Sequence, residues 1–453
     1  MVTLDRGMGL LQATATNIIG MVGVGPFLTI PFMVTAMNGP HIIYAWAFGA
    51  VLALCDGLVY AELGAALPGS GGPYVYLREA YRPFGLGRLM AFVFVFQLML
   101  VAPLSIAGGA VGFADYLGFY WASMSPTQHN LIAAAVCVAV TALLYRDITS
   151  VGRLAVVMLV VVLATVGWVI VAGLFTFSLA HAFDFPPEAR HVDAKLLRAM
   201  GAAGLLAMYN YGGYSNVCNI GEELRTPERT LPRAIVLSIV IVVVLYVVMS
   251  TVILGMVPWR EAQQTRTIAS LFIGRTFSDP ARGRIAAMVM TSLILFVTAS
   301  SLYSVVLGYS RIPFAAARDG QFFRIFGRLH PTKHFPHVSL LTIGLVTLPF
   351  CFFTLGQLVS WLIQVQILLQ FIWQCAAVIL LRRYRPDVAK PFRMWLYPLP
   401  ALISLTMWIA IFLSAPTAGM LFSAAFLAAA VAAYVVFEKK NGRPSSGTAV
   451  CDL

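Results

Sequence analysis

The sequence contains few charged residues. Asp, Glu, Lys and Arg make up 11% of its 453 residues, while 60% are hydrophobic. Soluble globular proteins average about 25% charged and about 45–50% apolar residues. A soluble fold has no way to bury this much apolar surface. The composition therefore excludes that class and indicates a membrane protein with several spans.

Residues for enzymatic chemistry are also scarce. The sequence has no HExxH, GxSxG or Walker A segment and no paired acids at the spacing of a metal site. Its six cysteines form no CxxC pair, and five of them lie in apolar segments, where cysteine packs as a small hydrophobe: Cys55, Cys137, Cys218, Cys351 and Cys375. We therefore expect no enzyme, no metal, no cofactor and no direct use of ATP.

Acidic residues are fewer than basic ones, 18 against 30. In a soluble protein this excess would suggest a nucleic-acid partner, but in a membrane protein Lys and Arg collect in cytoplasmic loops and fix the orientation. With both termini in the cytoplasm, most Lys and Arg fall inside, and the long loop 258–284, with five Arg, is the exception. We expect the lipid bilayer of the cell's inner (plasma) membrane, and no nucleic acid, as the partner. The sequence leaves the oligomeric state open.

Apolar stretches of about 20 residues predict the membrane spans. Two groups of five and a final pair give twelve: 10–37, 41–66, 86–116, 128–145 and 150–178; 195–221, 233–257, 283–317, 338–355 and 357–381; 395–413 and 416–437. We expect an all-α membrane protein with a single transmembrane domain over 1–453. Its parts are two groups of five helices (10–178 and 195–381), two additional helices (395–437) and a flexible cytoplasmic tail (438–453).

Two spans contain segments that break the helical pattern. The first predicted span holds MVGVGPFLTIP, Met21 to Pro31, and the sixth holds YNYGGYSN, Tyr209 to Asn216. Both spans open a group of five, and matched interruptions of this kind mark the binding site of transporters built from inverted repeats. We therefore expect helices 1 and 6 to be discontinuous.

A helix break inside a membrane has a chemical consequence. Unwound backbone persists only where protein, ligand or water satisfies its polar groups. A half-helix that begins there offers free amides to a carboxylate, and one that ends there offers carbonyls to an ammonium group. A zwitterionic α-amino acid carries both groups. The alternative is that the glycines at the breaks only allow close helix packing.

Several motifs resemble the amino acid–polyamine–organocation transporters, and bacterial-type amino acid permeases in particular. They run in that family's order along nearly the whole chain: GMVGVGPF from Gly20, YAELGAALPGSGGPYVYLREAY from Tyr60, YGGYSNVCNIGEELRTPERTLPRAI from Tyr211, SRIPFAAARDGQ from Ser310 and RPDVAKPFRMWLYP from Arg385. The resemblance implies that the two groups of five helices, 10–178 and 195–381, form an inverted repeat. It also implies a secondary active transporter that carries amino acids by alternating access, as a symporter, exchanger or uniporter. The alternative is a transporter of polyamines or other organic cations.

The resemblance also implies roles at the two breaks. The amides of Gly23, Val24 and Gly25 would bind the substrate carboxylate, carbonyls around Tyr209 and Asn210 would bind its amino group, and Tyr211 would be an aromatic gate. The candidate substrate-binding residues are Met21, Gly23, Val24, Gly25, Tyr209, Asn210, Tyr211, Gly212, Gly213 and Tyr214. For Tyr209, Tyr211 and Tyr214 the alternative is ordinary core or interfacial packing.

Three residues are candidates for ion coupling. Asp56 stands in the middle of the second span, where a carboxyl has to pair, face the interior or take up a proton; it is either a proton-coupling residue or a structural one. Ser300 and Ser301 lie where sodium-coupled relatives place hydroxyl ligands, although serines in membrane helices commonly bond their own backbone. A proton is thus the first candidate for a coupling ion and sodium the second.

Two polar clusters complete the prediction. Gln366, Gln370 and Gln374 follow at intervals of four and predict a polar stripe on one face of the tenth span, for hydrogen bonds between helices or for lining a pathway. Glu222 and Glu223 precede three arginines and predict a cytoplasmic hinge network with them: Arg225, Arg229 and Arg233.

Overall fold

The computed structural model describes residues 7–69, 71–145, 151–186, 193–331, 335–415 and 417–441. Within these ranges the chain is helical and has no strand, apart from one isolated bridge between Met8 and Leu224. The α-helices are α1 Leu10–Met21, α2 Gly25–Met37, α3 Ile43–Ala66, α4 Pro73–Tyr81, α5 Gly87–Leu117, α6 Pro126–Leu143, α7 Val151–Thr176, α8 Leu179–Ala182, α9 Ala194–Tyr211, α10 Pro227–Met256, α11 Trp259–Ala262, α12 Ile268–Arg275, α13 Pro280–Arg318, α14 His337–Thr347, α15 Leu355–Gln366, α16 Ile372–Tyr384, α17 Leu399–Ser414 and α18 Thr417–Asn441.

The predicted helical membrane class is confirmed. In the described part of the chain, eight helices are long and apolar enough to cross a membrane, and the bent pair α1 and α2 makes a ninth. The other three predicted spans correspond to α9, to α14 and to α17, and the last two are shorter apolar helices. The count of twelve and the inverted repeat remain predictions.

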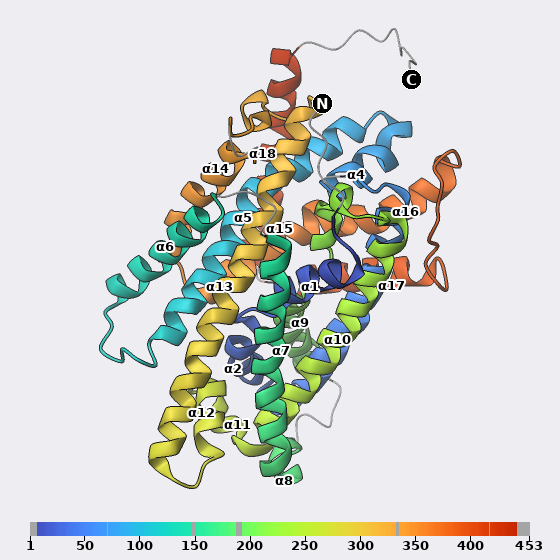
Figure 1. Cartoon of the computed structure of the whole chain (residues 1–453). Helices are drawn as coiled ribbons and strands as arrows, with labels where there is room; N and C mark the ends of the chain where they lie inside the picture. The colour runs from blue at the N-terminus through green and yellow to red at the C-terminus, as the bar shows by residue number, and fades with distance from the viewer. Residues whose placement is uncertain are drawn as a thin grey trace.

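The segments between the helices gather at two opposite ends of the molecule. Figure 1 shows α8, α11 and α12 at one end and α4 toward the other. At the α4 end, four contacts join segments predicted to be cytoplasmic: Met8 N to Glu223 O (3.1 Å), Arg78 to Asp319 (2.6 Å), Arg88 to Glu438 (3.1 Å) and Arg385 to Glu79 (3.0 Å).

Contacts at the end that carries α8, α11 and α12 join segments predicted to lie outside the cell. Trp259 donates to Asp184 at 3.3 Å, and Gln263 donates to the Val34 carbonyl at the same distance. The loops predicted for the two sides of the membrane therefore lie at opposite ends of the helices.

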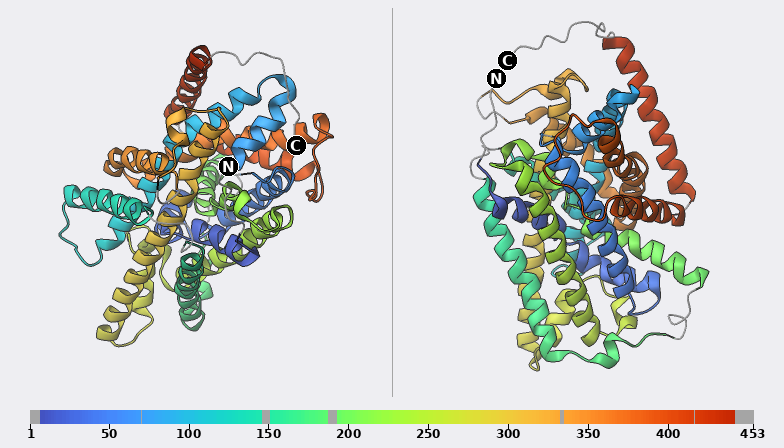
Figure 2. Two further views of the ribbon diagram at one scale, coloured as in Figure 1. Left: turned by 45° about the horizontal axis from the view of Figure 1, so that its top comes forward. Right: turned by 90° about the vertical axis from the view of Figure 1, so that its right-hand side faces the viewer.

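Burial separates the centre of the bundle from its lipid-facing edge. In its most apolar stretch α5 is 72% buried, whereas α6 and α18 are each 17% buried. Figure 2 shows α18, drawn in red, along the edge of the molecule and α6 leaning outward in the left-hand view. Apolar helices left this exposed are suited to contact with lipid tails. The two breaks lie inside, next to α5, α10 and α13.

Candidate functional site

The predicted break in the first span is present. α1 ends at Met21, α2 begins at Gly25, and the two helices differ in direction by 43°. The amides of Phe27 and Leu28 both donate to the Val24 carbonyl at 3.1 Å. In the described part of the chain, the amides of Val24 and Gly25 find no acceptor. Two free N–H groups at the start of α2 therefore point away from any intrahelical partner.

The sixth span is interrupted differently from the prediction. α9 ends at Tyr211, and the chain then continues in turns and two short 3-10 segments, Asn216–Asn219 and Gly221–Glu223, so the expected second half-helix does not form. Gly213 adopts φ +113°, a backbone conformation that L side chains rarely adopt. The Tyr209 carbonyl accepts no hydrogen bond from the described residues. It is free at the C-terminus of α9.

The glycines at the breaks also serve close packing. A Cβ atom added to Gly213 would lie 2.9 Å from the Gly20 carbonyl carbon, so the unwound segment touches α1 directly. A Cβ on Gly25 would lie 2.4 Å from Asn210 Oδ1, and one on Gly23 would lie 2.8 Å from Ser301 Oγ. The glycines therefore bring the two breaks together, as the packing alternative expects, and the binding of substrate by the adjoining backbone stays a prediction.

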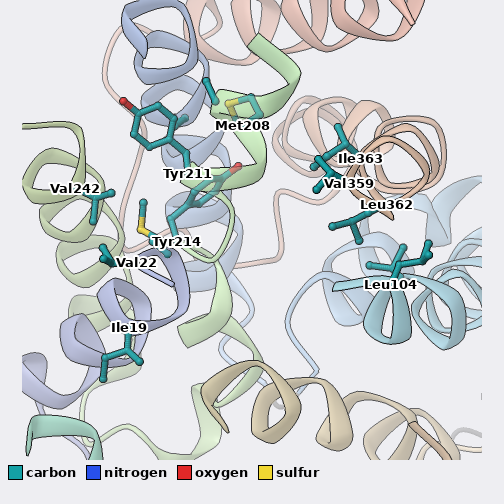
Figure 3. Close-up of a cluster of buried hydrophobic side chains, with 14 of the residues drawn as sticks. Ile19, Val22, Leu104, Met208, Tyr211, Tyr214, Val242, Val359, Leu362 and Ile363 are labelled. Carbon is teal, nitrogen blue, oxygen red and sulfur yellow. The ribbon is translucent and has the colours of Figure 1, made fainter. Parts of the chain in front are cut away.

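A cavity that is partly open to solvent lies between the two breaks and helices α5, α13 and α15. Nine of the ten candidate substrate-binding residues line it: Met21, Gly23, Val24, Gly25, Tyr209, Asn210, Gly212, Gly213 and Tyr214. Pro73 and Asn219 line it toward the α4 end, and none of its lining comes from α8, α11 or α12. Figure 3 shows Met208 and Tyr214 in one group and Leu362 and Ile363 in another, and all four line this cavity.

The placement predicted for Tyr211 is wrong. Its ring is fully buried outside the cavity lining, with ring centroids 5.6 Å from both Trp46 and Tyr246, and its hydroxyl donates to the Trp46 carbonyl at 3.3 Å. Residue 211 is the last of α9, and its side chain points back toward α3 and α10. The packing alternative applies to Tyr211, whereas Tyr209 and Tyr214 face the cavity.

Asp56 is buried behind the cavity and does not line it. Its Oδ2 accepts a hydrogen bond from the Tyr214 hydroxyl. Its Oδ1 accepts from Ser404 Oγ at 2.9 Å, Trp408 Nε1 at 3.1 Å and Cys375 Sγ at 3.6 Å. The carboxyl thus links α3 to the unwound segment, α16 and α17. Each of its described partners donates a hydrogen bond to it.

The two serines of α13 differ in position. Ser300 Oγ donates to the Phe296 carbonyl of its own helix at 2.8 Å, and Ser300 does not line the cavity. Ser301 lines the cavity and faces Gly23. Of these two serines, only Ser301 lies at the cavity beside the first break.

Two residues that the sequence analysis did not single out hold the breaks in place. Asn17 of α1 is fully buried; its Nδ2 donates to the Tyr214 carbonyl at 2.7 Å and its Oδ1 accepts from the Val217 amide at 3.0 Å. The Tyr246 hydroxyl of α10 donates to the Met21 carbonyl at 2.8 Å and lies 3.4 Å from the Asn210 carbonyl. An asparagine inside an apolar run is a signal that could have identified Asn17. Nothing in the sequence around Tyr246 distinguishes it from a packing tyrosine.

The glutamine stripe is interrupted by a turn of π-helix at Ile367–Phe371. Gln366 and Gln370 line the cavity, whereas Gln374 is buried elsewhere. Gln370 donates to the Tyr60 hydroxyl at 2.6 Å and accepts from Gln97 at 3.0 Å. π-Turns of this kind are frequent at functional sites. The stripe therefore provides hydrogen bonds between helices and part of the cavity wall.

In the predicted cytoplasmic hinge network, Glu222 and Glu223 pair with other arginines than expected. Glu223 pairs with Arg311 of α13 at 3.0 Å, and both side chains are about nine-tenths buried. Glu222 lies 4.0 Å from Arg318. Both acidic residues thus face the end of α13 and not the arginines that follow them in sequence.

Comparison with known proteins places the chain in a family. Residues 8–437 match the family model described as amino acid permease. The chain belongs to the amino acid permease family. This permease is 30% identical to an uncharacterized transporter of Mycobacterium tuberculosis over 354 residues, covering 76% of this chain and 73% of the relative.

Two relatives from Bacillus subtilis cover more of the permease. A methylthioribose transporter is 23% identical over 457 residues, covering 97% of this chain and 95% of the relative. The branched-chain amino acid permease BcaP is 24% identical over 414 residues, covering 86% of this chain and 84% of the relative. The family and the apolar helices together make this chain a multi-pass membrane protein.

Proposed function

We propose that this permease is a secondary active transporter of amino acids that binds its substrate between the two helix breaks. The observation that carries the proposal is the pairing of free backbone groups in one cavity: the amides of Val24 and Gly25 and the carbonyl of Tyr209. The start of α2 suits a carboxylate, and the end of α9 suits an ammonium group. An α-amino acid presents both on one carbon.

Tyr209 takes, in this proposal, the aromatic position first given to Tyr211. It lines the cavity, and its ring lies 3.4 Å from a Cβ atom built on Gly25. The ring therefore borders the place where the carboxylate would bind. Ser301 borders the same place from α13.

The transport cycle that we propose is alternating access across the cell membrane, in a twelve-span chain with both termini in the cytoplasm. The cavity reaches toward the α4 end, where the segments predicted to be cytoplasmic meet. This conformation therefore corresponds to an inward-facing state. A proton is the first candidate for the coupling ion, and sodium, with Ser301 as a hydroxyl ligand, is the second.

The polyamine alternative has less support. A polyamine carries several positive charges and no carboxylate, so its site requires acidic side chains. No Asp or Glu is among the described residues that line the cavity, and Asp56 lies behind Tyr214 and Trp408.

The test is uptake by purified protein in liposomes, with and without a proton or sodium gradient. Radiolabelled amino acids, spermidine and methylthioribose form the panel, and we expect amino acids to be transported. The proposal would be contradicted if spermidine or methylthioribose is taken up while no amino acid is transported or competes with that uptake.

A variant pair tests the site itself. Gly25→Val should abolish amino acid binding, because its Cβ would lie 2.4 Å from Asn210 Oδ1 and its methyl groups would cover the free amides. Gly167→Val in α7 is the control, since a Cβ there meets nothing within 4 Å. Both variants are compared by thermal stability and by substrate binding. Unchanged affinity in Gly25→Val would mean that the glycine serves packing alone.

A further inference from the structure

We infer that the substrate's side chain is uncharged and mainly apolar. This inference rests on the proposed function and adds the substrate class. It concerns the chamber that lies beyond the bare backbone groups, which is the part of the cavity lined by α5, α13 and α15.

The wall that α5, α13 and α15 form combines aliphatic residues with the hydroxyl-bearing Ser105, Thr298, Ser301 and Tyr309, and its described residues include no charged side chain. Ser301 lies against Gly23, so the residues that follow it on α13 border the same space: Leu302 and Val305 both line the cavity. From α15, Leu362 and Ile363 line it as well. A solute held by its backbone groups at the breaks would therefore have uncharged side chains, several of them aliphatic, around its own side chain.

α5 and α13 approach each other closely at this wall. A Cβ built on Gly109 would lie 2.7 Å from a Leu302 methyl carbon. Gly109 lines the cavity and keeps it open at this point. Because residue 109 has no side chain, the chamber keeps room for the side chain of the substrate.

Ionic partners are absent from the chamber. The described lining contains no Asp, Glu, Lys, Arg or His. The acids near the bundle interior are already engaged: Asp56 accepts from four donors, Glu223 pairs with Arg311, and Glu62 pairs with Arg382 at 2.5 Å. A buried charge without a partner is strongly disfavoured. Lysine, arginine, aspartate and glutamate would each place such a charge here.

Two amide side chains line the chamber at the π-turn. Gln370 is engaged with Tyr60 and Gln97, but the side chain of Gln366 forms no hydrogen bond with the described residues and is half-buried in the lining. A carboxylate at position 366 would be a free anion in the cavity. This position therefore offers a direct way to change the charge preference.

The experiment is competition against labelled leucine in proteoliposomes. We expect leucine, methionine and phenylalanine to compete about tenfold or more better than arginine, lysine, glutamate and aspartate. Gln366→Glu should let arginine and lysine compete. Gln357→Glu, on the exposed side of the same helix, is the control and should keep the wild-type preference.

The outcomes separate the two proposals. Failure of every amino acid to move or compete would overturn the proposed function. Transport of arginine or glutamate at the leucine rate would overturn the neutral-substrate inference and leave the proposed function standing. If Gln366→Glu still transports leucine but excludes arginine and lysine, position 366 does not face the substrate's side chain, and the chamber is assigned wrongly.

Discussion

The hydroxyl of Tyr214 donates a hydrogen bond to the buried carboxyl of Asp56. This contact joins the middle of α3 to the unwound segment after α9, across 158 positions of sequence. Tyr214 also lines the cavity, so the same side chain touches the solute space and the buried acid. A change at Asp56 can therefore reach the binding site through one side chain.

Asp56→Asn should lower uptake and thermal stability, because the amide NH₂ cannot accept the hydrogen bonds that the carboxyl accepts. An unmet buried donor costs about 1–3 kcal/mol. If Asp56 takes up the coupling proton, the variant should also lose the pH dependence of uptake. Tyr214→Phe removes the same contact and leaves the carboxyl in place, so its pH profile should keep the wild-type shape. Equal profiles in wild type and Asp56→Asn would make Asp56 structural.

Tyr246→Phe should weaken substrate binding by roughly tenfold, which corresponds to about 1.4 kcal/mol. The lost hydroxyl fixes the Met21 carbonyl at the first break and approaches the Asn210 carbonyl at the second. Tyr211→Phe is the matched control, because its hydroxyl contacts the Trp46 carbonyl and neither break. Binding can be measured by ligand-induced thermal stabilisation. An equal effect of the two variants would contradict the role given to Tyr246.

Glu223→Gln should destabilise the folded protein by about 3–5 kcal/mol, because Arg311 would keep a buried charge without its ionic partner. The neighbouring Glu222→Gln should change stability by less than about 1 kcal/mol, since its pair with Arg318 is long and partly exposed. Unfolding in detergent measures both. A double variant, Glu223→Gln with Arg311→Met, should recover part of the loss, and no recovery would show that the pair is not the cause.

Acid should destabilise the α4 end through Glu79, which lies outside the membrane-spanning helices. Burial raises the pKa of this carboxyl, but hydrogen bonds from Arg385 and Arg78 outweigh it and hold the pKa below its usual 4.5. A carboxyl with a lower pKa in the folded state adds stability above the unfolded pKa, and this stability is lost as pH falls through the folded pKa. Thermal stability should therefore decline below about pH 4.5. The stability of Glu79→Gln should decline less with acid than that of the wild type, and an equal decline would contradict the role given to Glu79.

Much of the fold could be predicted because hydropathy is a local property. The apolar stretches matched helices, and the first break was expected at Gly23 to Pro26 because Gly and Pro act on their own backbone angles. The sixth span was predicted less well. Its α-helix does not resume after Tyr211, because the segment to Glu223 is held by long-range contacts such as those of Asn17.

Sequence alone determined the membrane class, the helical content and the location of both breaks, since each depends on composition or on neighbouring residues. Tertiary structure decided which side chains meet. Tyr209 and Tyr211 are two positions apart on one helix and therefore face different sides, one the cavity and the other the core, and only the packing of α9 shows which is which. The donors around Asp56 likewise come from residues 214, 375, 404 and 408, and helix packing brings them together.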